Sequence, residues 1–210
     1  MPSHKSIGRL SLYRSILNRL LRDGVNSLFS HELASLAGAT PSQVRRDLMV
    51  TGYTGSPVRG YDVRDLLASI GRFLDAPESE GVALVGVGNL GRAIMAFFTG
   101  RRPSLTIQAA FDRDPYKVNR VIHGIRCHPM EDLESVLVRE HVRVAIITVP
   151  AIEAQDIADR LCRAGVKGIL NFAPVRLRVL PSVFVEDVDV TMSLEKVAYY
   201  SRQGNRAEGI

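Results

Sequence analysis

The chain has 210 residues, of which 46% are hydrophobic, so it can build one large or two small cores and extensive disorder is excluded. No apolar run approaches the roughly 18 residues of a membrane span and the first residues form no apolar signal segment, so we expect a cytoplasmic protein without membrane contact. The net charge is +5, but residues 1–60 hold eight Lys/Arg against three Asp/Glu, whereas residues 61–210 hold nineteen of each. A basic front and a neutral remainder predict a polyanion-binding module joined to a second domain.

Helical spacing dominates the basic front. Apolar residues from Leu10 to Leu21 recur at three- and four-residue steps and predict a helix that Asp23-Gly24 ends. Ser30 is predicted to cap a short helix over residues 31–36, and Gly38-Ala39 to form the following turn.

A third helix opens at Thr40, with Pro41 at its first position and Gln43 three residues after the cap. Val44 and Leu48 face inward on it, and the polar side chains face outward. This pattern is typical of a helix-turn-helix whose third helix enters a major groove. The candidate DNA contacts on this helix are Ser42, Gln43, Arg45 and Arg46.

Residues 51–61 are punctuated by glycine and carry Tyr53, Arg59 and Tyr61. They form either a β-hairpin wing on the phosphate backbone, with Arg59 and Tyr61 as contacts, or a linker loop. A further helix is predicted over residues 62–74 and a domain boundary over residues 75–81. We therefore expect a winged-helix DNA-binding domain over residues 1–80.

An apolar strand pattern from Val82 breaks into a G-x-G-x-x-G motif and then becomes helical. In this setting the motif is the dinucleotide-binding fingerprint: Gly86 makes the tight turn, Gly88 allows close approach of a pyrophosphate, and Gly91 packs the helix on the strand. The pyrophosphate is then expected on the free N–H groups at the start of that helix.

Strands and helices alternate beyond this point. Their nearly continuous apolar runs indicate strands buried on both faces, hence a doubly wound parallel sheet of the Rossmann type. The expected strands are 82–87, 106–111, 142–149, 168–172 and 183–188, and the expected helices are 89–98, 131–140 and 152–164.

Asp112 ends the second of these strands, about twenty residues past the fingerprint. A carboxylate there accepts hydrogen bonds from ribose hydroxyls and repels a 2′-phosphate, so NAD(H) is favoured over NADP(H). The neighbouring Arg113 weakens this preference, because an arginine can serve a 2′-phosphate. The alternative interpretation of Asp112 is a solvated carboxylate at the end of a strand.

The sequence does not predict an enzyme. It offers no triad or carboxylate pair, and His123 and His128 lie in a short connection where packing or surface roles are expected. Cys127 and Cys162 lack metal-ligand spacing, so no metal is expected; we interpret them as buried thiols, with a redox switch as the alternative. A small NAD-dependent oxidoreductase with an accessory domain and a CoA-binding module stay open as rival functions.

The whole chain, from about residue 9 to residue 200, resembles the Rex family of redox-sensing transcriptional repressors. The resemblance rests on the stretches Arg9-Leu10-Ser11-Leu12-Tyr13, Gln43-Val44-Arg45-Arg46-Asp47-Leu48, Gly60-Tyr61-Asp62-Val63, Gly86-Val87-Gly88-Asn89-Leu90-Gly91, Phe111-Asp112-Arg113-Asp114-Pro115, Ile147-Thr148-Val149-Pro150-Ala151 and Gly165 to Val175.

This resemblance implies a winged-helix domain, a Rossmann NAD(H)-binding domain over residues 81–191, and a homodimer whose C-terminal helix, residues 192–200 within the segment 192–210, is exchanged with the partner. It also implies repression at a palindromic operator in double-stranded DNA, released when NADH replaces NAD. The implied cofactor-binding residues are Gly86, Val87, Gly88, Asn89, Leu90, Gly91, Asp112, Arg113, Thr148 and Pro150, and the implied switch and dimer residues are Arg14, Phe97, Asp189 and Tyr199.

The chain departs from the family pattern at three places. Ser56-Pro57-Val58 replaces the usual Lys-Arg-Gly of the wing, Ser15 replaces an arginine of the first helix, and Phe97 replaces a tyrosine. The last two belong to a polar network with the aspartate matched by Asp189, which Arg14 is then expected to complete. A DNA-binding protein with impaired or altered discrimination between NADH and NAD is therefore an alternative function.

Overall fold

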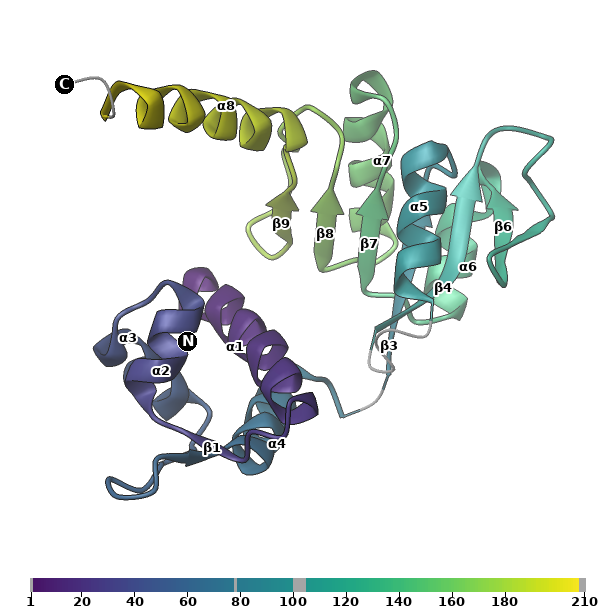
Figure 1. The fold of residues 1–210 in the computed structure, drawn as a ribbon. Coiled ribbons are helices and arrows are strands. Elements are labelled where there is room, and N and C mark those ends of the chain that lie inside the picture. The colour runs from purple at the N-terminus through teal and green to yellow at the C-terminus, as the bar shows by residue number, and fades with distance from the viewer. Residues whose placement is uncertain (1, 78, 100–104, 208–210) are drawn as a thin grey trace. The chain divides into compact units, whose positions relative to one another are not determined.

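A computed structural model describes residues 2–77, 79–99 and 105–207 of the chain. The chain divides into two compact units, Met1–Pro77 and Glu78–Ile210 (Figure 1). The division falls within residues 75–81, the segment predicted to hold the domain boundary. Each unit has its own apolar core, so each is described by itself.

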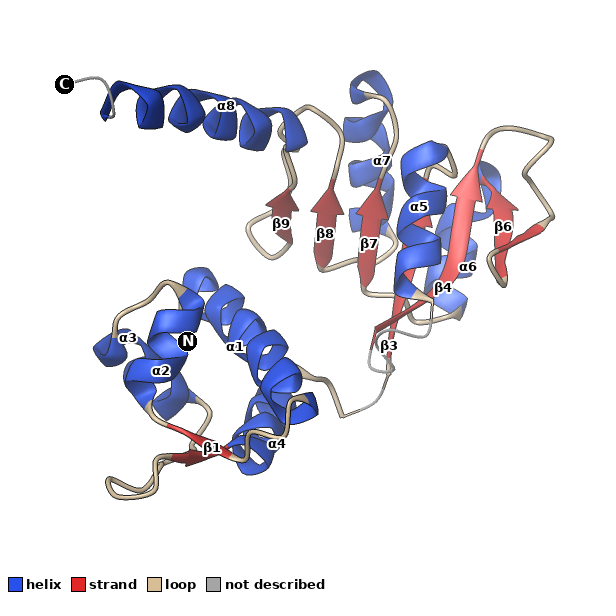
Figure 2. Cartoon of the chain, viewed as in Figure 1, coloured by secondary structure: helices blue, strands red, loops and turns tan. Residues whose placement is uncertain are grey.

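The N-terminal unit packs helices around one core and adds a small antiparallel sheet (Figure 2). Leu10, Tyr13 and Leu17 of the first helix are fully buried, as the spacing predicts. This arrangement confirms the predicted winged helix-turn-helix. Its elements are α1 (His4–Arg22), β1 (Ser27–Leu28), α2 (Ser30–Ala37), α3 (Pro41–Val50), β2 (Tyr61–Asp62) and α4 (Val63–Leu74).

Helix starts follow the predicted chemistry at α3 but not at α2. The Thr40 hydroxyl accepts the N–H of Gln43 at 3.2 Å, and Pro41 is the first residue of α3. The prediction that Ser30 caps α2 is wrong. Ser30 is the first residue inside α2, and the cap position is Phe29, whose N–H donates to the Glu32 carboxylate at 2.6 Å. The Ser30 hydroxyl instead accepts a hydrogen bond from Arg45.

The wing is a short closed turn rather than a long hairpin. Ser56 and Gly60 exchange two backbone hydrogen bonds of 2.8 Å each. The next residue, Tyr61, begins β2, which pairs with β1. Gly60 has a φ of +72°, and a Cβ there would lie 2.5 Å from the carbonyl oxygen of Leu28. The segment is therefore closed by glycine geometry, which favours a wing over a linker.

A buried carboxylate joins the third helix to the first. Asp47 of α3 is 2% exposed and accepts hydrogen bonds from Arg9 Nε at 2.6 Å, Arg9 Nη2 at 2.7 Å and the Tyr13 hydroxyl at 3.1 Å. Burial acts to raise the pKa of Asp47, but the bonds from Arg9 and Tyr13 outweigh it and the pKa lies below its usual value. Burial and the bond to Asp47 raise the pKa of Tyr13 to about 12. The orientation of α3 on α1 thus depends on one bidentate ion pair.

The described part of the C-terminal unit forms one seven-stranded sheet in the order β5-β6-β4-β3-β7-β8-β9. All neighbours pair in parallel except β5 and β6. The sheet confirms the predicted doubly wound fold, with the strand order reversing direction at β3. Its strands are β3 (Glu80–Val85), β4 (Leu105–Asp112), β5 (Val121–Ile122), β6 (Ile125–Pro129), β7 (Val144–Ile147), β8 (Gly168–Asn171) and β9 (Phe184–Asp187).

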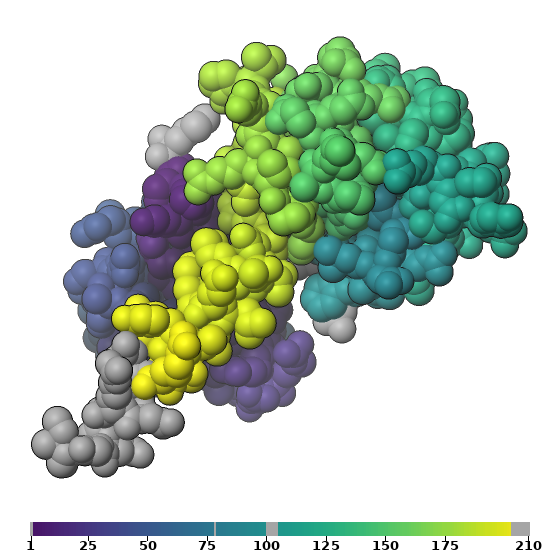
Figure 3. Space-filling view, turned by 90° about the horizontal axis from the view of Figure 1, so that it is seen from above, coloured from purple at the N-terminus to yellow at the C-terminus, as the bar shows by residue number. Residues whose placement is uncertain are grey.

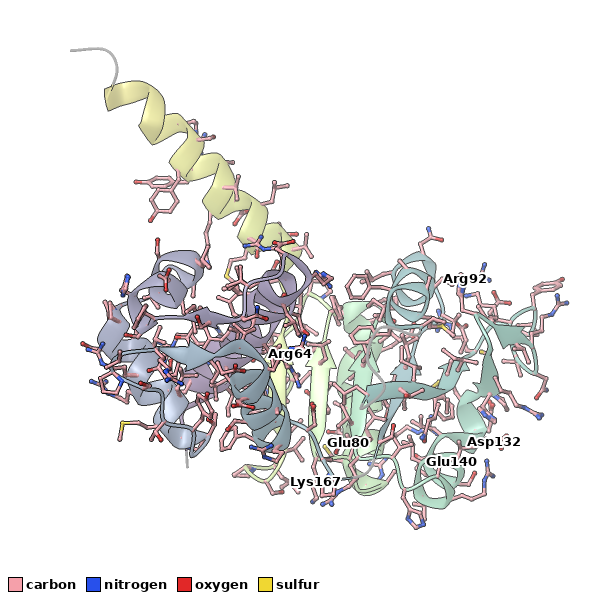
Figure 4. The ribbon with its side chains drawn as sticks, turned by 60° about the horizontal axis from the view of Figure 1, so that its bottom comes forward. Arg64, Glu80, Arg92, Asp132, Glu140 and Lys167 are labelled. Carbon is pink, nitrogen blue, oxygen red and sulfur yellow. The ribbon has the colours of Figure 1, made fainter. Side chains whose placement is uncertain are left out.

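Helices cover both faces of this sheet. The cluster that contains Ala83 and Val85 of β3 packs on α6 (Leu133–Arg139) and α7 (Ala151–Arg163), whereas the cluster with Val82 and Leu84 packs on α5 (Asn89–Phe98). Alternate residues of β3 therefore face opposite layers, and the strand is buried on both sides. Glu80 and Lys167, labelled in Figure 4, mark the edge where β3 and β8 begin; the glycine motif lies at the opposite edge.

Three features differ from the sequence prediction. The connection expected to carry His123 and His128 contains a hairpin, β5 and β6, and His128 lies in β6 beside Phe111 with ring centroids 5.6 Å apart. His123 and Gly124 both have positive φ, as a two-residue hairpin turn requires. A 3₁₀ turn, Met130–Asp132, replaces the first turn expected of α6. The last helix, α8 (Val190–Ala207), is longer than predicted at both ends.

We expect Asp47→Asn to destabilise the N-terminal unit by about 3 kcal/mol, because it leaves the Arg9 guanidinium without its buried partner. Urea unfolding followed by circular dichroism at 222 nm measures this change. Because the folded-state pKa of Asp47 is lowered, its stabilising effect is present above the unfolded value of about 4 and is lost as the pH falls through the folded value. The difference between the parent and the variant therefore shrinks in acid.

The matched control for this substitution is Asp23→Asn, since Asp23 is an exposed aspartate that follows α1. An equal loss of stability in both variants would contradict the role given to Asp47.

Candidate nucleotide site and DNA-binding surface

The glycine motif joins β3 to α5 in a turn that excludes side chains. Gly86 has a φ of +99°, and a Cβ there would lie 2.8 Å from the carbonyl oxygen of Thr148. A Cβ at Gly91 would collide with the carbonyl oxygen of Gly86, whereas one at Gly88 would meet nothing within 4 Å. The structure therefore agrees with the predicted roles: Gly86 makes the tight turn, Gly88 faces open space, and Gly91 packs the helix closely on the strand.

Asp112 braces this turn from the end of β4. It is 8% exposed; Oδ2 accepts the N–H of Val87 at 2.7 Å and Oδ1 accepts that of Asp114 at 2.8 Å. Lys117 Nζ lies 3.1 Å from Oδ2. The alternative interpretation of Asp112 as a solvated strand end is therefore wrong, because its carboxylate is buried and bonded.

The carboxylate keeps capacity for a ligand. Burial acts to raise the pKa of Asp112, but the two backbone N–H groups and Lys117 outweigh it, so the pKa is lowered and the group is ionised. An ionised carboxylate offers about four lone-pair sites, of which three are used here. One acceptor position therefore remains for a ribose hydroxyl.

A cavity of about 220 Å³ lies at this edge of the sheet, beside the ends of β3, β4 and β7. Six predicted cofactor residues line it: Gly86, Gly88, Asp112, Arg113, Thr148 and Pro150. The other four lie close by in the chain: Val87 is buried and bonded to Asp112, Asn89 and Leu90 begin α5 and are exposed, and Gly91 packs on Gly86. The structure thus brings the predicted set together.

Lys117, Met130 and Glu153 line the same cavity and were not predicted. Glu153 pairs with Arg113 at 2.8 Å, but the Arg113 side chain is 74% exposed, so this pair contributes little stability. Lys117 follows the Asp114-Pro115 turn, which is a signal that the sequence contains. Met130 begins the 3₁₀ turn after β6 and Glu153 lies in the first turn of α7, and only the assembled sheet brings them to Asp112.

Thr148 acts on the turn as well as on the cavity. Its hydroxyl lies 2.6 Å from the Gly86 carbonyl oxygen and 3.1 Å from that of Val85, and its N–H donates to Val85 at 2.9 Å. The residue after β7 therefore clamps the last residue of β3 and the first glycine of the motif.

A second ion pair holds the Met130 side of the cavity. Arg160 of α7 makes a bidentate pair with Glu134 of α6, with distances of 2.7 Å, and donates to the Met130 carbonyl oxygen at 2.6 Å. The hydrogen bonds from Arg160 lower the pKa of Glu134 to about 2. The pair therefore stays charged at neutral pH and fixes the backbone of Met130.

The recognition helix α3 presents the predicted polar face. Ser42, Arg45 and Arg46 are exposed and Gln43 is half-buried, while Val44 and Leu48 are buried. Arg45 donates to the Ser30 hydroxyl at 3.0 Å and to the Ser42 hydroxyl at 3.4 Å. Its guanidinium is therefore held between the starts of α2 and α3, and keeps further N–H donors for DNA.

The two predicted wing contacts differ in position. Arg59 is exposed on the closed turn. Tyr61, in contrast, is 9% exposed and belongs to the core, with its ring packed beside Gly55, where a Cβ would lie 2.5 Å from Cδ1 of the tyrosine. The Tyr61 ring therefore packs under the wing, and its contact with DNA stays a prediction.

The predicted switch residues lie on separate elements. Arg14 of α1 pairs with Asp75 at 2.7 Å within the N-terminal unit. Asp189 instead accepts the N–H of Met192 at 2.8 Å and caps α8. Phe97 and Tyr199 are both more than half exposed. The Arg14–Asp189 network stays a prediction.

Other chemistry is sparse in the part of the chain that the structure describes. Among those residues no group of three His, Cys, Asp or Glu is arranged for a metal ion, and none of the described helices is long and apolar enough to cross a membrane. Cys127 is buried, and burial raises its pKa to about 11, so its thiol is protonated. Burial and Arg126 lower the pKa of His128.

Two family descriptions match parts of this chain. Residues 78–175 match the family described as "CoA binding domain", and residues 3–48 match the one described as "Putative DNA-binding protein N-terminus". The first match covers the glycine motif and its cavity, and the second covers α1, α2 and most of α3.

Relatives that match along the whole chain share one name. The redox-sensing transcriptional repressor Rex of Syntrophobacter fumaroxidans is 40% identical over 201 residues, which cover 95% of this chain and 96% of the relative. The protein of that name in Carboxydothermus hydrogenoformans is 39% identical over 94% of this chain and 95% of its own.

Solved structures give the same result. RSP, a Rex-family repressor, has been solved in complex with β-NADH. That structure is 31% identical in sequence to this chain and superposes with a TM-score of 0.88, and the match covers 99% of this chain and 98% of RSP. Its complex with β-NAD+ and operator DNA is 32% identical, with a TM-score of 0.88 and coverage of 99% and 96%. The chain therefore belongs to the Rex family of redox-sensing transcriptional repressors.

Proposed function

We propose that this chain is a cytoplasmic transcriptional repressor that binds a palindromic operator as a homodimer and is released from DNA when NADH replaces NAD+ in its C-terminal unit. The observation that carries this proposal is the presence, in one chain, of an exposed recognition helix and a glycine turn with an ionised ribose-type acceptor beside it. The solved complexes of RSP with NADH and with NAD+ and operator DNA support the same pairing of ligands.

Each residue at the nucleotide edge has a distinct role in this proposal. The first N–H groups of α5 hold the pyrophosphate at the positive end of the helix dipole. Asp112 accepts a ribose hydroxyl and holds the Val87 N–H in place, and Lys117 balances its charge. Thr148 keeps the Gly86 carbonyl turned away from the ligand. The bound dinucleotide supplies the redox signal through its nicotinamide ring.

The N-terminal unit supplies operator binding. Arg45 and Arg46 contact guanine edges or phosphates, and Gln43 and Ser42 contact bases or backbone beside them. Arg59 contacts a phosphate from the wing. With Ser56, Pro57 and Val58 in place of a basic segment, the wing contributes one cation, so most of the basic contact comes from α3.

The dimer is proposed to form through α8. Large apolar side chains of this helix are 47–70% exposed: Val190, Met192, Leu194, Val197, Tyr199 and Tyr200. Such a row on one helix favours burial against another chain. Arg14 Nε is buried without a hydrogen-bond partner among the described residues, and a carboxylate such as Asp189 of a second subunit would satisfy it.

We propose that the nucleotide is a signal and is not consumed. The relatives are repressors by name, and the described cavity contains no His–carboxylate or nucleophile–base pair. A small oxidoreductase is the rival function, and it requires turnover of the nicotinamide absorbance with some substrate. The CoA-binding alternative follows the name of one family match, and competition of CoA against bound NADH tests it.

The proposed function is tested by fluorescence anisotropy of the purified protein on a palindromic Rex-type operator, with NADH and NAD+ titrated separately at fixed salt. We expect NADH, but not NAD+, to release the DNA, because the two cofactors present differently charged nicotinamide rings. Tight DNA binding that ignores both would support the alternative of altered discrimination, and no binding to any such operator would overturn the proposal.

We expect Arg46→Ala to weaken operator binding and to lower the slope of log K against log [salt] by about 1, because one phosphate-neutralising cation is lost. A loss by guanine contact would instead cost about 1–3 kcal/mol at one base pair. Arg64→Ala, on α4, is the matched control: it removes the same charge from outside the recognition helix. If the parent and Arg46→Ala have equal salt slopes, and base-pair changes in the operator affect their affinities equally, Arg46 does not contact the DNA.

We expect Gly91→Ala to lower NADH affinity by about 1–3 kcal/mol, because its methyl group collides with the Gly86 carbonyl and forces the turn apart. Titration of NADH fluorescence measures the loss. Gly8→Ala is the control, since a Cβ at Gly8 meets nothing within 4 Å. Unchanged NADH affinity in Gly91→Ala would mean that the nucleotide binds elsewhere.

A further inference from the structure

Asn171, the last residue of β8, is a buried polar residue that the nucleotide site does not use. It is 1% exposed, and its side chain makes hydrogen bonds in two directions. Oδ1 accepts the N–H of Ala173 at 3.0 Å. Nδ2 donates to Val175 O at 2.8 Å, to Ala173 O at 3.3 Å and to Asp187 Oδ1 at 2.8 Å. The amide therefore binds its own following loop and the end of the neighbouring strand.

The second direction leads to α8. Asp187 ends β9 and pairs in register with Asn171, and the next residue, Val188, donates its N–H to the Asn171 carbonyl oxygen at 2.8 Å. Asp189 follows at once and caps α8. Asn171 thus binds β9 with both its main chain and its side chain, directly before α8 begins.

The opposite direction leads back to the glycine turn. Phe172, the residue after Asn171, donates its N–H to the Ile147 carbonyl oxygen at 2.9 Å, and Thr148 clamps Gly86. A row of hydrogen bonds therefore connects the ends of β3, β7, β8 and β9, from the nucleotide turn to the start of α8. Asn171 provides its only side-chain amide link within the described residues.

The helix that starts from this row depends on it for direction. Every side chain from 189 to 202 is exposed, and the space-filling view shows α8 at the surface (Figure 3, yellow). Its described side chains are not buried within their own unit, so the end of β9 sets where α8 begins. In the single chain α8 is held only at its base, so a shift at the end of β9 moves the surface that this helix would present to a second subunit.

We infer that Asn171, through Asp187, is the positioning residue that couples the nucleotide edge to α8, and that it is needed for the ligand response but not for binding either ligand. The inference rests on the proposed function, since it assigns a route to the NADH response. It predicts that a variant can lose the ligand response, measured as the ratio of operator affinities without and with NADH. The NADH affinity and the operator affinity without NADH should then stay unchanged.

Asp187→Ala is the main test, because Asp187 is exposed and its removal leaves the loop bonds of Asn171 intact. We expect unchanged NADH affinity and unchanged operator affinity without NADH. The ratio of operator affinities without and with NADH is expected to fall by about fivefold or more. Asp187→Asn keeps an oxygen that accepts from Nδ2, and is expected to preserve the response. Glu186→Gln, at the adjacent exposed carboxylate, is the matched control.

Asn171→Asp is the second variant. It places a carboxylate oxygen where Nδ2 faces Asp187, so like charges meet and the link breaks while the side-chain shape is kept. The same loss of response is expected, and sedimentation velocity reports whether the dimer persists. If this variant does not fold, Asp187→Ala decides alone.

The outcomes separate this inference from the proposed function. A parent protein that binds operator but ignores NADH overturns the proposed response and the coupling with it. A parent that responds while Asp187→Ala responds equally overturns only the role of Asn171. Loss of NADH affinity in Asp187→Ala also overturns it, because the pair would then belong to the binding site.

Discussion

The contact between Gly91 and the carbonyl oxygen of Gly86 is the constraint on which the C-terminal unit depends. No side chain fits there, so α5 lies directly on the end of β3 and its first N–H groups point across the edge of the sheet. Three neighbours hold this geometry: Asp112 takes the Val87 N–H, Thr148 takes the Gly86 carbonyl, and Phe111 O accepts the Gly86 N–H at 2.8 Å. The Gly86 N–H, the Gly86 carbonyl and the Val87 N–H are therefore bonded within the unit, and the open side at Gly88 is left for a ligand.

The N-terminal unit uses a comparable device with a different purpose. A buried carboxylate, Asp47, holds Arg9 and Tyr13 of α1 onto α3, just as Asp112 at the end of β4 holds the Val87 N–H of the glycine turn. In both cases hydrogen bonds outweigh the effect of burial on the carboxyl pKa and keep the group charged. The exposed face of α3 can then be polar and basic without weakening the unit, because the opposite face of this helix is fixed to α1 through Asp47.

The sequence predicted those features that depend on local rules. The Thr40-Pro41 helix start, the glycine turn and Asp112 at a strand end follow from backbone chemistry and periodicity, and the structure contains each of them. The cap at Ser30 failed because a residue from another helix, Arg45, takes its hydroxyl. The contacts of Glu153 and Asn171 depend on strands being brought side by side, which no spacing along the chain reveals. Lys117, in contrast, reaches Asp112 across the local Asp114-Pro115 turn. The β5–β6 hairpin has a signal in the sequence, the turn His123-Gly124 between Val121-Ile122 and Ile125.

Affinity for the nucleotide and discrimination between its redox states must come from different parts of the molecule. NADH and NAD+ share the same adenosine half, so the contacts proposed for Asp112, Lys117 and the glycine turn would be the same for both forms. Such contacts would not let the two forms shift a conformational equilibrium differently. Moving a two-state equilibrium from 1:99 to 99:1 takes about 5.5 kcal/mol of differential affinity, and a ligand with equal affinity for both states supplies none of it. The charge difference lies on the nicotinamide ring, and the charged groups of the described cavity, Asp112, Arg113, Lys117 and Glu153, cluster around the ribose acceptor. We therefore expect the groups that respond to redox state to lie outside the lining of the described cavity. Phe97 and Ser15, which replace polar residues of the family pattern, do not line the described cavity, so we expect these substitutions to affect the signal more than the binding of the cofactor.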